Sequence, residues 1–87
     1  MTWTIEITKT AEKQICSFDK TTQTRLVKFL RTLATTSNPR QSGKALKGSK
    51  AQLWRYRVGD YRVICNVEDP TTCITVLEVG HRREIYR

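Results

Sequence analysis

Residues 53–67 read LWRYRVGDYRVICNV, and this stretch decides the fold. Apolar and polar residues alternate on both sides of a central Gly-Asp pair, which is the period of a half-buried β-strand. A two-residue connection that contains glycine is typical of a β-hairpin. We therefore predict antiparallel strands at 53–58 and 61–68, and a third strand at 73–79 after a second short turn.

The first half of the chain predicts one strand and two helices. Residues 2–8 alternate polar and apolar side chains, which indicates an early strand. Thr8 or Thr10 can cap a first helix and Asp19 a second, because Thr and Asp side chains accept hydrogen bonds from the first N–H groups of a helix. The second helix is predicted to end within residues 35–43, where Asn-Pro and Ser-Gly disfavour helix.

The resulting order, β-α-α-β-β-β, predicts an α+β fold with a four-stranded, mainly antiparallel sheet and a helical hairpin on one face. Residues 44–52 are polar and basic and predict a loop. A single domain over residues 1–87 is expected, because two cores would leave each half too small to fold unaided. The chain has no membrane-spanning apolar run and no signal-peptide pattern, so we expect a cytoplasmic protein without a membrane partner.

Alternation also assigns the two faces of the predicted sheet. Apolar positions of the two hairpin strands share one side, which is expected to meet the helices. Those positions are Trp54, Tyr56, Val58, Tyr61, Val63, Cys65 and Val67. Arginines at 55, 57 and 62 then point to the opposite side. We expect Ile64, Ile74 and Val76 to form an apolar floor beside them.

The charge of the chain is concentrated near these arginines. Sixteen Lys and Arg against eight Asp and Glu give a net charge of +8. Residues 40–62 contain seven of the basic residues and one acid, so most of the excess lies in this segment. A solvated surface spreads its charges more evenly, and the clustering favours a face that binds a polyanion such as nucleic acid.

The C-terminal segment EVGHRREIYR, residues 78–87, adds groups suited to RNA cleavage. Cleavage without a metal requires a proton acceptor for the ribose 2′-hydroxyl, cations for the phosphorane and a proton donor for the leaving oxygen. His81 is the one histidine and exchanges protons near neutral pH, whereas arginine stays protonated. His81 and Tyr86, the tyrosine of this segment, also have purely structural interpretations. His81 would then be a surface histidine, and Tyr86 would be a packing residue near the C-terminus.

Several motifs taken together resemble the RelE/ParE superfamily of toxins, and especially its RelE-type branch. They are KALKG at 44–48, the L-W-R-x-R-x-G-x-Y-R pattern beginning at 53 and the V-G-H-R-x-E-x-Y ending. The resemblance implies a RelE-like microbial RNase fold and an mRNA interferase, an endoribonuclease that needs neither metal nor cofactor and inhibits translation. It also implies action in the ribosomal A site and silencing by a co-expressed, acidic antitoxin of a type II toxin-antitoxin system.

Nine residues receive expected roles, six of them carried over by position from the resemblance and three, Lys44, Lys47 and Lys50, as basic residues of the predicted loop. The RNA-binding set is Lys44, Lys47, Lys50, Arg55 and Arg57. The catalytic set is Arg62, His81, Arg82 and Tyr86. Some relatives have lysines at positions 55 and 57, and one of those lysines has been considered as the base. Because arginine cannot accept the proton, we assign that role here to His81, with Arg62 and Arg82 stabilising charge and Tyr86 aiding the leaving group or stacking on a base.

Two other functions fit the same residues. A ParE-type toxin inhibits DNA gyrase and cleaves no RNA. A non-enzymatic RNA-binding module uses the basic face for affinity alone.

Overall fold

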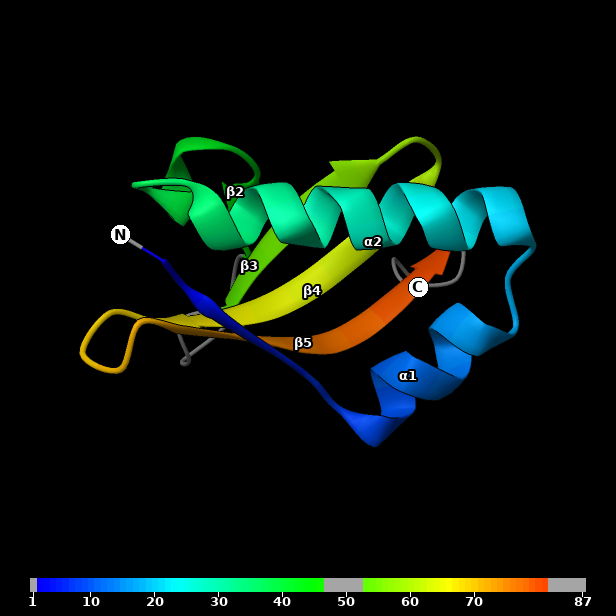
Figure 1. The fold of residues 1–87 in the computed structure, drawn as a ribbon, viewed down its shortest axis with the longest axis horizontal. Helices are drawn as coiled ribbons and strands as arrows, with labels where there is room; N and C mark the ends of the chain where they lie inside the picture. Colours follow the sequence, from blue (N-terminus) through cyan, green and yellow to red (C-terminus); the bar gives the residue numbers. More distant parts are fainter. Residues whose placement is uncertain (1, 47–52, 82–87) are drawn as a thin grey trace.

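The computed structural model describes residues 2–46 and 53–81. Five strands, two α-helices and one short 3₁₀ helix are found in these residues (Figure 1). In chain order they are β1 (Thr4–Ile7), α1 (Lys9–Cys16), α2 (Lys20–Thr35), η1 (Pro39–Gln41), β2 (Lys44–Ala45), β3 (Leu53–Val58), β4 (Tyr61–Glu68) and β5 (Cys73–His81).

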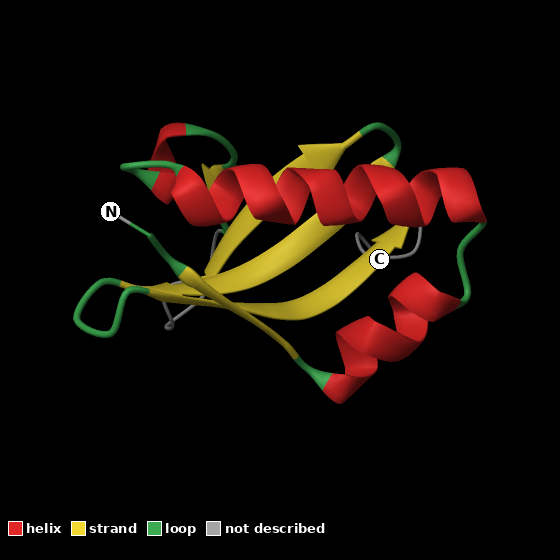
Figure 2. Cartoon of the chain, viewed as in Figure 1, coloured by secondary structure: helices red, strands yellow, loops and turns green. Residues whose placement is uncertain are grey.

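The strands form one sheet in the order β1-β5-β4-β3-β2. β1 runs parallel to β5, and the other neighbours are antiparallel. Figure 2 shows α2 crossing the sheet in one layer while the strands form the other. The predicted α+β class with helices on one face is therefore confirmed. No helix in the described parts of the chain is both long and apolar enough to cross a membrane.

The sheet has one strand more than predicted. The prediction of a loop over residues 44–52 was wrong for Lys44 and Ala45, which pair with Arg55 and Trp54 as the edge strand β2. The indole Nε1 of Trp54 donates to the carbonyl of Ser42 at 2.6 Å and holds this strand against β3. Two residues show no readable alternation, so the hydrophobic pattern could not reveal the strand.

The helices begin where the sequence predicts. Thr8 is the N-cap of α1, with its Oγ1 accepting from the Ala11 N–H at 3.2 Å and donating to the Val76 carbonyl at 3.0 Å. Asp19 is the N-cap residue of α2 as predicted, but its side chain makes no capping hydrogen bond to an N–H group of the helix. Its carboxylate accepts a 2.5 Å hydrogen bond from the Thr22 hydroxyl, and this bond lowers the pKa of Asp19. The α2 helix ends at Thr35, inside the predicted range.

The core lies between the helices and the sheet. The prediction for the hairpin strands is confirmed, since Tyr56 and Val63 are paired, buried and part of one cluster with leucines of α2. Tyr56 is 1% exposed, and its hydroxyl donates to the Pro39 carbonyl at 2.7 Å. Burial raises the pKa of this phenol, so it serves as a neutral hydrogen-bond donor that fixes the segment before β2.

A β-bulge divides β5 into two halves. Cys65 pairs with Val76 and Ile64 with Glu78, so Leu77 is an extra residue on β5. The extra residue reverses the faces, with Val76 directed to the core before the bulge and Val79 after it. Glu78 and Gly80 consequently lie on the sheet face opposite the helices, here called the open face.

Two predictions for β5 were wrong. Ile74 and Val76 were expected on the open face, yet both are 0% exposed and belong to the core. The last strand was predicted to end at residue 79, yet β5 continues to His81 because Gly80 pairs with Arg62. The bulge accounts for the first error, since simple alternation cannot anticipate an inserted residue. Ile64 does lie on the open face, opposite Glu78.

Candidate functional site

A basic groove lies on the open face, at the side of the sheet formed by β2, β3 and β4. It has a volume of about 370 Å³. Within the described parts of the chain, its lining residues are Gly43, Lys44, Arg55, Tyr56, Arg57 and Arg62. Four of these residues are cationic and none is acidic, so the groove concentrates positive potential where an anion can enter.

Strand register brings the cations together. Lys44 pairs with Arg55 across β2 and β3, and Arg57 pairs with Arg62 across β3 and β4. Like charges directly opposite each other on antiparallel strands destabilise a sheet. Two such cation pairs on adjacent strands are expected where a surface is shaped for binding rather than for stability.

The β3–β4 turn fixes the Arg57 and Arg62 pair. Gly59 has φ +60° at the first turn position, the pattern of a type II′ hairpin, whose twist matches the flanking strands. The Arg57 Nε donates to the Gly59 carbonyl at 3.3 Å, while the residue stays exposed. Arg55 and Arg62 are half-buried and extend the groove toward the centre of the sheet.

Gly43 allows β2 to reach β3. Its φ is +77°, and a Cβ at this position would lie 2.4 Å from the Arg55 carbonyl oxygen and 2.8 Å from the Trp54 Nε1. Only glycine fits so close to another backbone in this conformation. The residue was missed as a site element by the sequence analysis, although the Ser-Gly step before the basic segment was the signal that could have indicated it.

Arg40 belongs to the basic segment of the sequence but lies outside the groove. Its Nη1 contacts the two carboxylate oxygens of Asp69 at 2.8 and 2.9 Å, and its Nη2 donates to the Val67 carbonyl at 2.9 Å. The guanidinium thus joins the segment after α2 to the β4–β5 turn. Its charge is neutralised by Asp69, which lies outside the basic segment 40–62.

The structure places His81 on the face opposite the basic groove. His81 pairs with Tyr61, and their rings meet edge to face with centroids 5.7 Å apart. Tyr61 in turn contacts Phe18, which packs against the core, with centroids 4.7 Å apart. Arg62 follows Tyr61 along β4 and therefore points the other way. The described structure does not bring the imidazole to the arginines.

The remaining predicted site residues are outside the described part of the chain. They are Lys47, Lys50, Arg82 and Tyr86. Of the other five, the structure gathers Lys44, Arg55, Arg57 and Arg62 in one groove and separates His81 from them. Among the residues described, no cluster of three or more His, Cys, Asp or Glu is arranged to hold a metal ion.

Comparison with known protein families decides the class of this protein. Residues 5–86 match the family described as the ParE toxin of the type II toxin-antitoxin system parDE. The chain belongs to this family. It is thus a type II toxin-antitoxin toxin, and the predicted membership of the RelE/ParE superfamily is confirmed.

Individual relatives of this ParE-family toxin carry RelE-type names. Toxin RelG of Mycobacterium tuberculosis is 29% identical over 87 residues, covering 100% of this chain and 99% of the relative. The toxin-antitoxin complex RelBE2 of M. tuberculosis matches with a TM-score of 0.83 and 26% identity, over 94% of this chain and 100% of that chain. The archaeal RelE-RelB complex of Pyrococcus horikoshii matches with a TM-score of 0.78 and 32% identity, over 94% and 97%.

Proposed function

We propose that this toxin is an mRNA endoribonuclease that acts on the ribosome in the cytoplasm and thereby inhibits translation. The observation that carries the proposal is the groove in which three adjacent strands present four cations, with no acid among its described lining residues. A run of RNA phosphates fits this surface, because each guanidinium offers a planar fork to phosphate oxygens. The RelE-type names of the relatives further support an RNA substrate.

The proposed reaction is a transphosphorylation. The 2′-oxygen attacks the neighbouring phosphorus, the bond from phosphorus to the 5′-oxygen breaks, and the products are a 2′,3′-cyclic phosphate and a 5′-hydroxyl. We assign Arg62 and Arg82 to the negative charge of the phosphorane and Tyr86 to the leaving oxygen or to base stacking. The RNA backbone is held by Arg55, Arg57, Lys44, Lys47 and Lys50. His81 is left out of this set because its ring contacts Tyr61 on the helix side.

Purified toxin incubated with messenger RNA on programmed ribosomes tests the proposal. We expect fragments with 5′-hydroxyl ends, and binding to isolated RNA that weakens steeply as salt is raised. Intact message together with inhibited gyrase supercoiling would assign the protein to the gyrase inhibitors, which the ParE description of the matched family favours. Intact message that is nevertheless bound would reduce the protein to an RNA-binding module.

We further propose that an acidic antitoxin neutralises this toxin. The net charge of +8 favours an acidic partner, and the structural relatives were solved as complexes of RelE-type toxins with antitoxins.

The substitution His81→Gln is expected to leave the cleavage rate within about threefold of wild type, because the imidazole lies on the face away from Arg62. The same substitution is expected to lower the free energy of unfolding by about 1 kcal/mol, through loss of the edge contact with Tyr61. Single-turnover cleavage and urea unfolding measure the two effects. A hundredfold lower cleavage rate with an unchanged free energy of unfolding would instead assign the role of general base to His81.

A further inference from the structure

The bulge in β5 directs a carboxylate to the open face. Ile74 and Val76 precede Leu77 and point into the core. Without the extra residue, Glu78 would follow Val76 on the same face and would place a carboxylate among apolar side chains, at a high cost in free energy. With the bulge, Glu78 instead pairs with Ile64 on the arginine side of the sheet. Bulges commonly re-aim a side chain in this way beside active sites.

Register places Glu78 close to the basic groove. Glu78 is opposite Ile64, and Arg62 is opposite Gly80, so Glu78 and Arg62 are diagonal neighbours on one face. Diagonal neighbours on antiparallel strands lie about 7–8 Å apart, within the span of one nucleotide's ribose and phosphate. Gly80 has no side chain, so none projects from the position directly across from Arg62.

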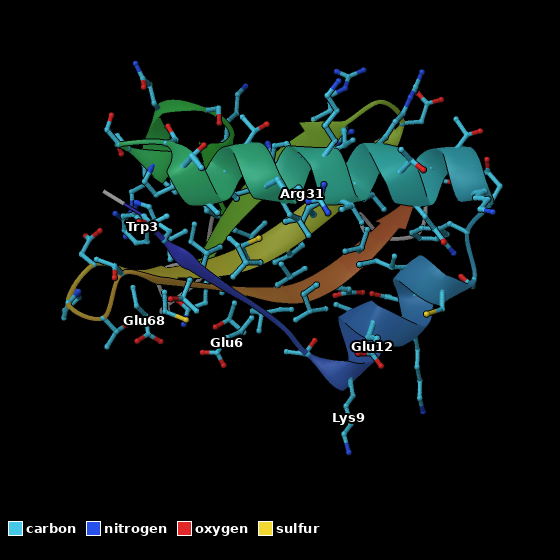
Figure 3. The ribbon with its side chains drawn as sticks, viewed as in Figure 1. Trp3, Glu6, Lys9, Glu12, Arg31 and Glu68 are labelled. Atoms are coloured by element: carbon cyan, nitrogen blue, oxygen red, sulfur yellow. The ribbon has the colours of Figure 1, made fainter. Side chains whose placement is uncertain are left out.

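Other open-face acids on the described strands lie farther from Arg62. Glu68 is six residues along β4, which corresponds to about 20 Å of extended strand. Glu6 is on β1, with β5 between it and β4, and it contacts the Cys73 thiol at 3.1 Å. Both project near the β1 edge in Figure 3. Among the acidic residues of the described strands, Glu78 is thus the one that the strand register brings nearest to Arg62.

The carboxylate of Glu78 is accessible to a ligand. The residue is exposed. Within residues 2–46 and 53–81, the structure gives it no ion pair, whereas Arg40 and Asp69 form one. A carboxylate has the chemistry that the arginines lack, because it accepts a proton while they remain protonated.

We propose that Glu78 is a catalytic residue whose carboxylate accepts the proton of the ribose 2′-hydroxyl as the 2′-oxygen attacks the phosphorus held by Arg62. This inference rests on the proposed endoribonuclease function. The new bond joins the 2′-oxygen to phosphorus, and the electron pair of the broken bond leaves with the 5′-oxygen. The proton passes from the 2′-oxygen to Glu78, while the 5′-oxygen takes a proton from water.

The substitution Glu78→Gln tests the assignment in single-turnover cleavage on programmed ribosomes. General base catalysis contributes about 10²–10⁴-fold, so we expect the rate to fall at least a hundredfold. Affinity for a non-cleavable RNA with a 2′-deoxy sugar at the scissile position is expected to be equal or tighter, because a negative charge is removed beside the phosphates. Glu78→Asp keeps the carboxylate and is expected to retain more activity than Glu78→Gln. Glu68→Gln, on the same face but distant, is expected to cleave at the wild-type rate.

A substrate with sulfur in place of the 5′-bridging oxygen separates the base from the acid. A thiolate leaves without protonation. With this substrate, the rate defect of a variant that lacks the general acid therefore disappears, whereas the rate defect of a variant that lacks the general base remains. A Glu78→Gln defect that persists supports the proposal, and one that disappears overturns it. Wild-type cleavage with an equally active Glu78→Gln variant also overturns it while leaving the nuclease function intact. Absence of cleavage by the wild-type toxin would overturn both.

Discussion

Replacing Arg62 by alanine is expected to slow RNA cleavage by about a hundredfold or more, which corresponds to roughly 3 kcal/mol of transition-state stabilisation. Arg62 is half-buried in the groove, opposite Arg57 on the neighbouring strand. In the proposed reaction, a guanidinium held in this way stabilises the charge that develops on the phosphorane without reorganisation of solvent. The single-turnover rate at saturating substrate isolates this effect from the loss of RNA affinity.

Arg31→Ala is the matched control for Arg62→Ala. Arg31 is an exposed arginine on α2, in the helical layer (Figure 3). Both substitutions remove one positive charge from the protein, so a nonspecific charge effect would slow cleavage equally in both. We expect Arg31→Ala to cleave at nearly the wild-type rate. Equal losses in the two variants would contradict a catalytic role for Arg62.

The largest expected effect on stability is that of Gly43→Ala. The backbone at Gly43 has φ +77°, and the added methyl would lie 2.4 Å from the Arg55 carbonyl oxygen. Strain in the left-handed region and displacement of a neighbouring strand together are expected to lower the free energy of unfolding by about 3 kcal/mol or more. Urea denaturation followed by tryptophan fluorescence, to which Trp54 beside this turn contributes, measures the change.

Gly59→Ala separates strain from steric overlap. Gly59 also has a positive φ, +60°, but the nearest atom to an added Cβ is the Arg25 Nη1 at 3.5 Å, an ordinary contact. This variant therefore carries only the backbone cost of about 1–2 kcal/mol. If Gly43→Ala lowers the free energy of unfolding by no more than Gly59→Ala does, β2 moves away from β3 without a cost in stability.

Alternation predicted the central hairpin correctly because β3 and β4 bury one face and expose the other. Tyr56 and Val63 face the core, Arg57 and Arg62 face outward, and a two-residue turn fixes their register. The same reasoning failed at β2, whose two residues are positioned by a glycine turn and an indole hydrogen bond rather than by a hydrophobic pattern. Interactions between distant segments decide such an element.

For the candidate site, the positions of the arginines were predictable, and the faces on which Glu78 and His81 lie were not. Guanidinium positions follow from the hairpin register, which is local in sequence. The orientations of Glu78 and His81 depend on the bulge at Leu77. The structure reveals this bulge because Ile74, Val76 and Val79 all lie in the core, which simple alternation does not allow. The sequence predicted His81 as the proton acceptor because histidine exchanges protons near neutral pH. The bulge places its ring on the sheet face that meets the helices.

Parallel pairing of β1 with β5 has a consequence for how the toxin is made. Thr4 on β1 pairs with Cys73, so β1 forms its hydrogen bonds only after roughly 70 more residues have been synthesised. At about 5–20 residues per second, translation imposes a delay of several seconds on this pairing. Strand β5 also contributes Ile74, Val76 and Val79 to the core. The nascent polypeptide therefore lacks much of its core until β5 has been synthesised. The ribosome that synthesises the toxin therefore carries an incompletely folded chain for most of that time.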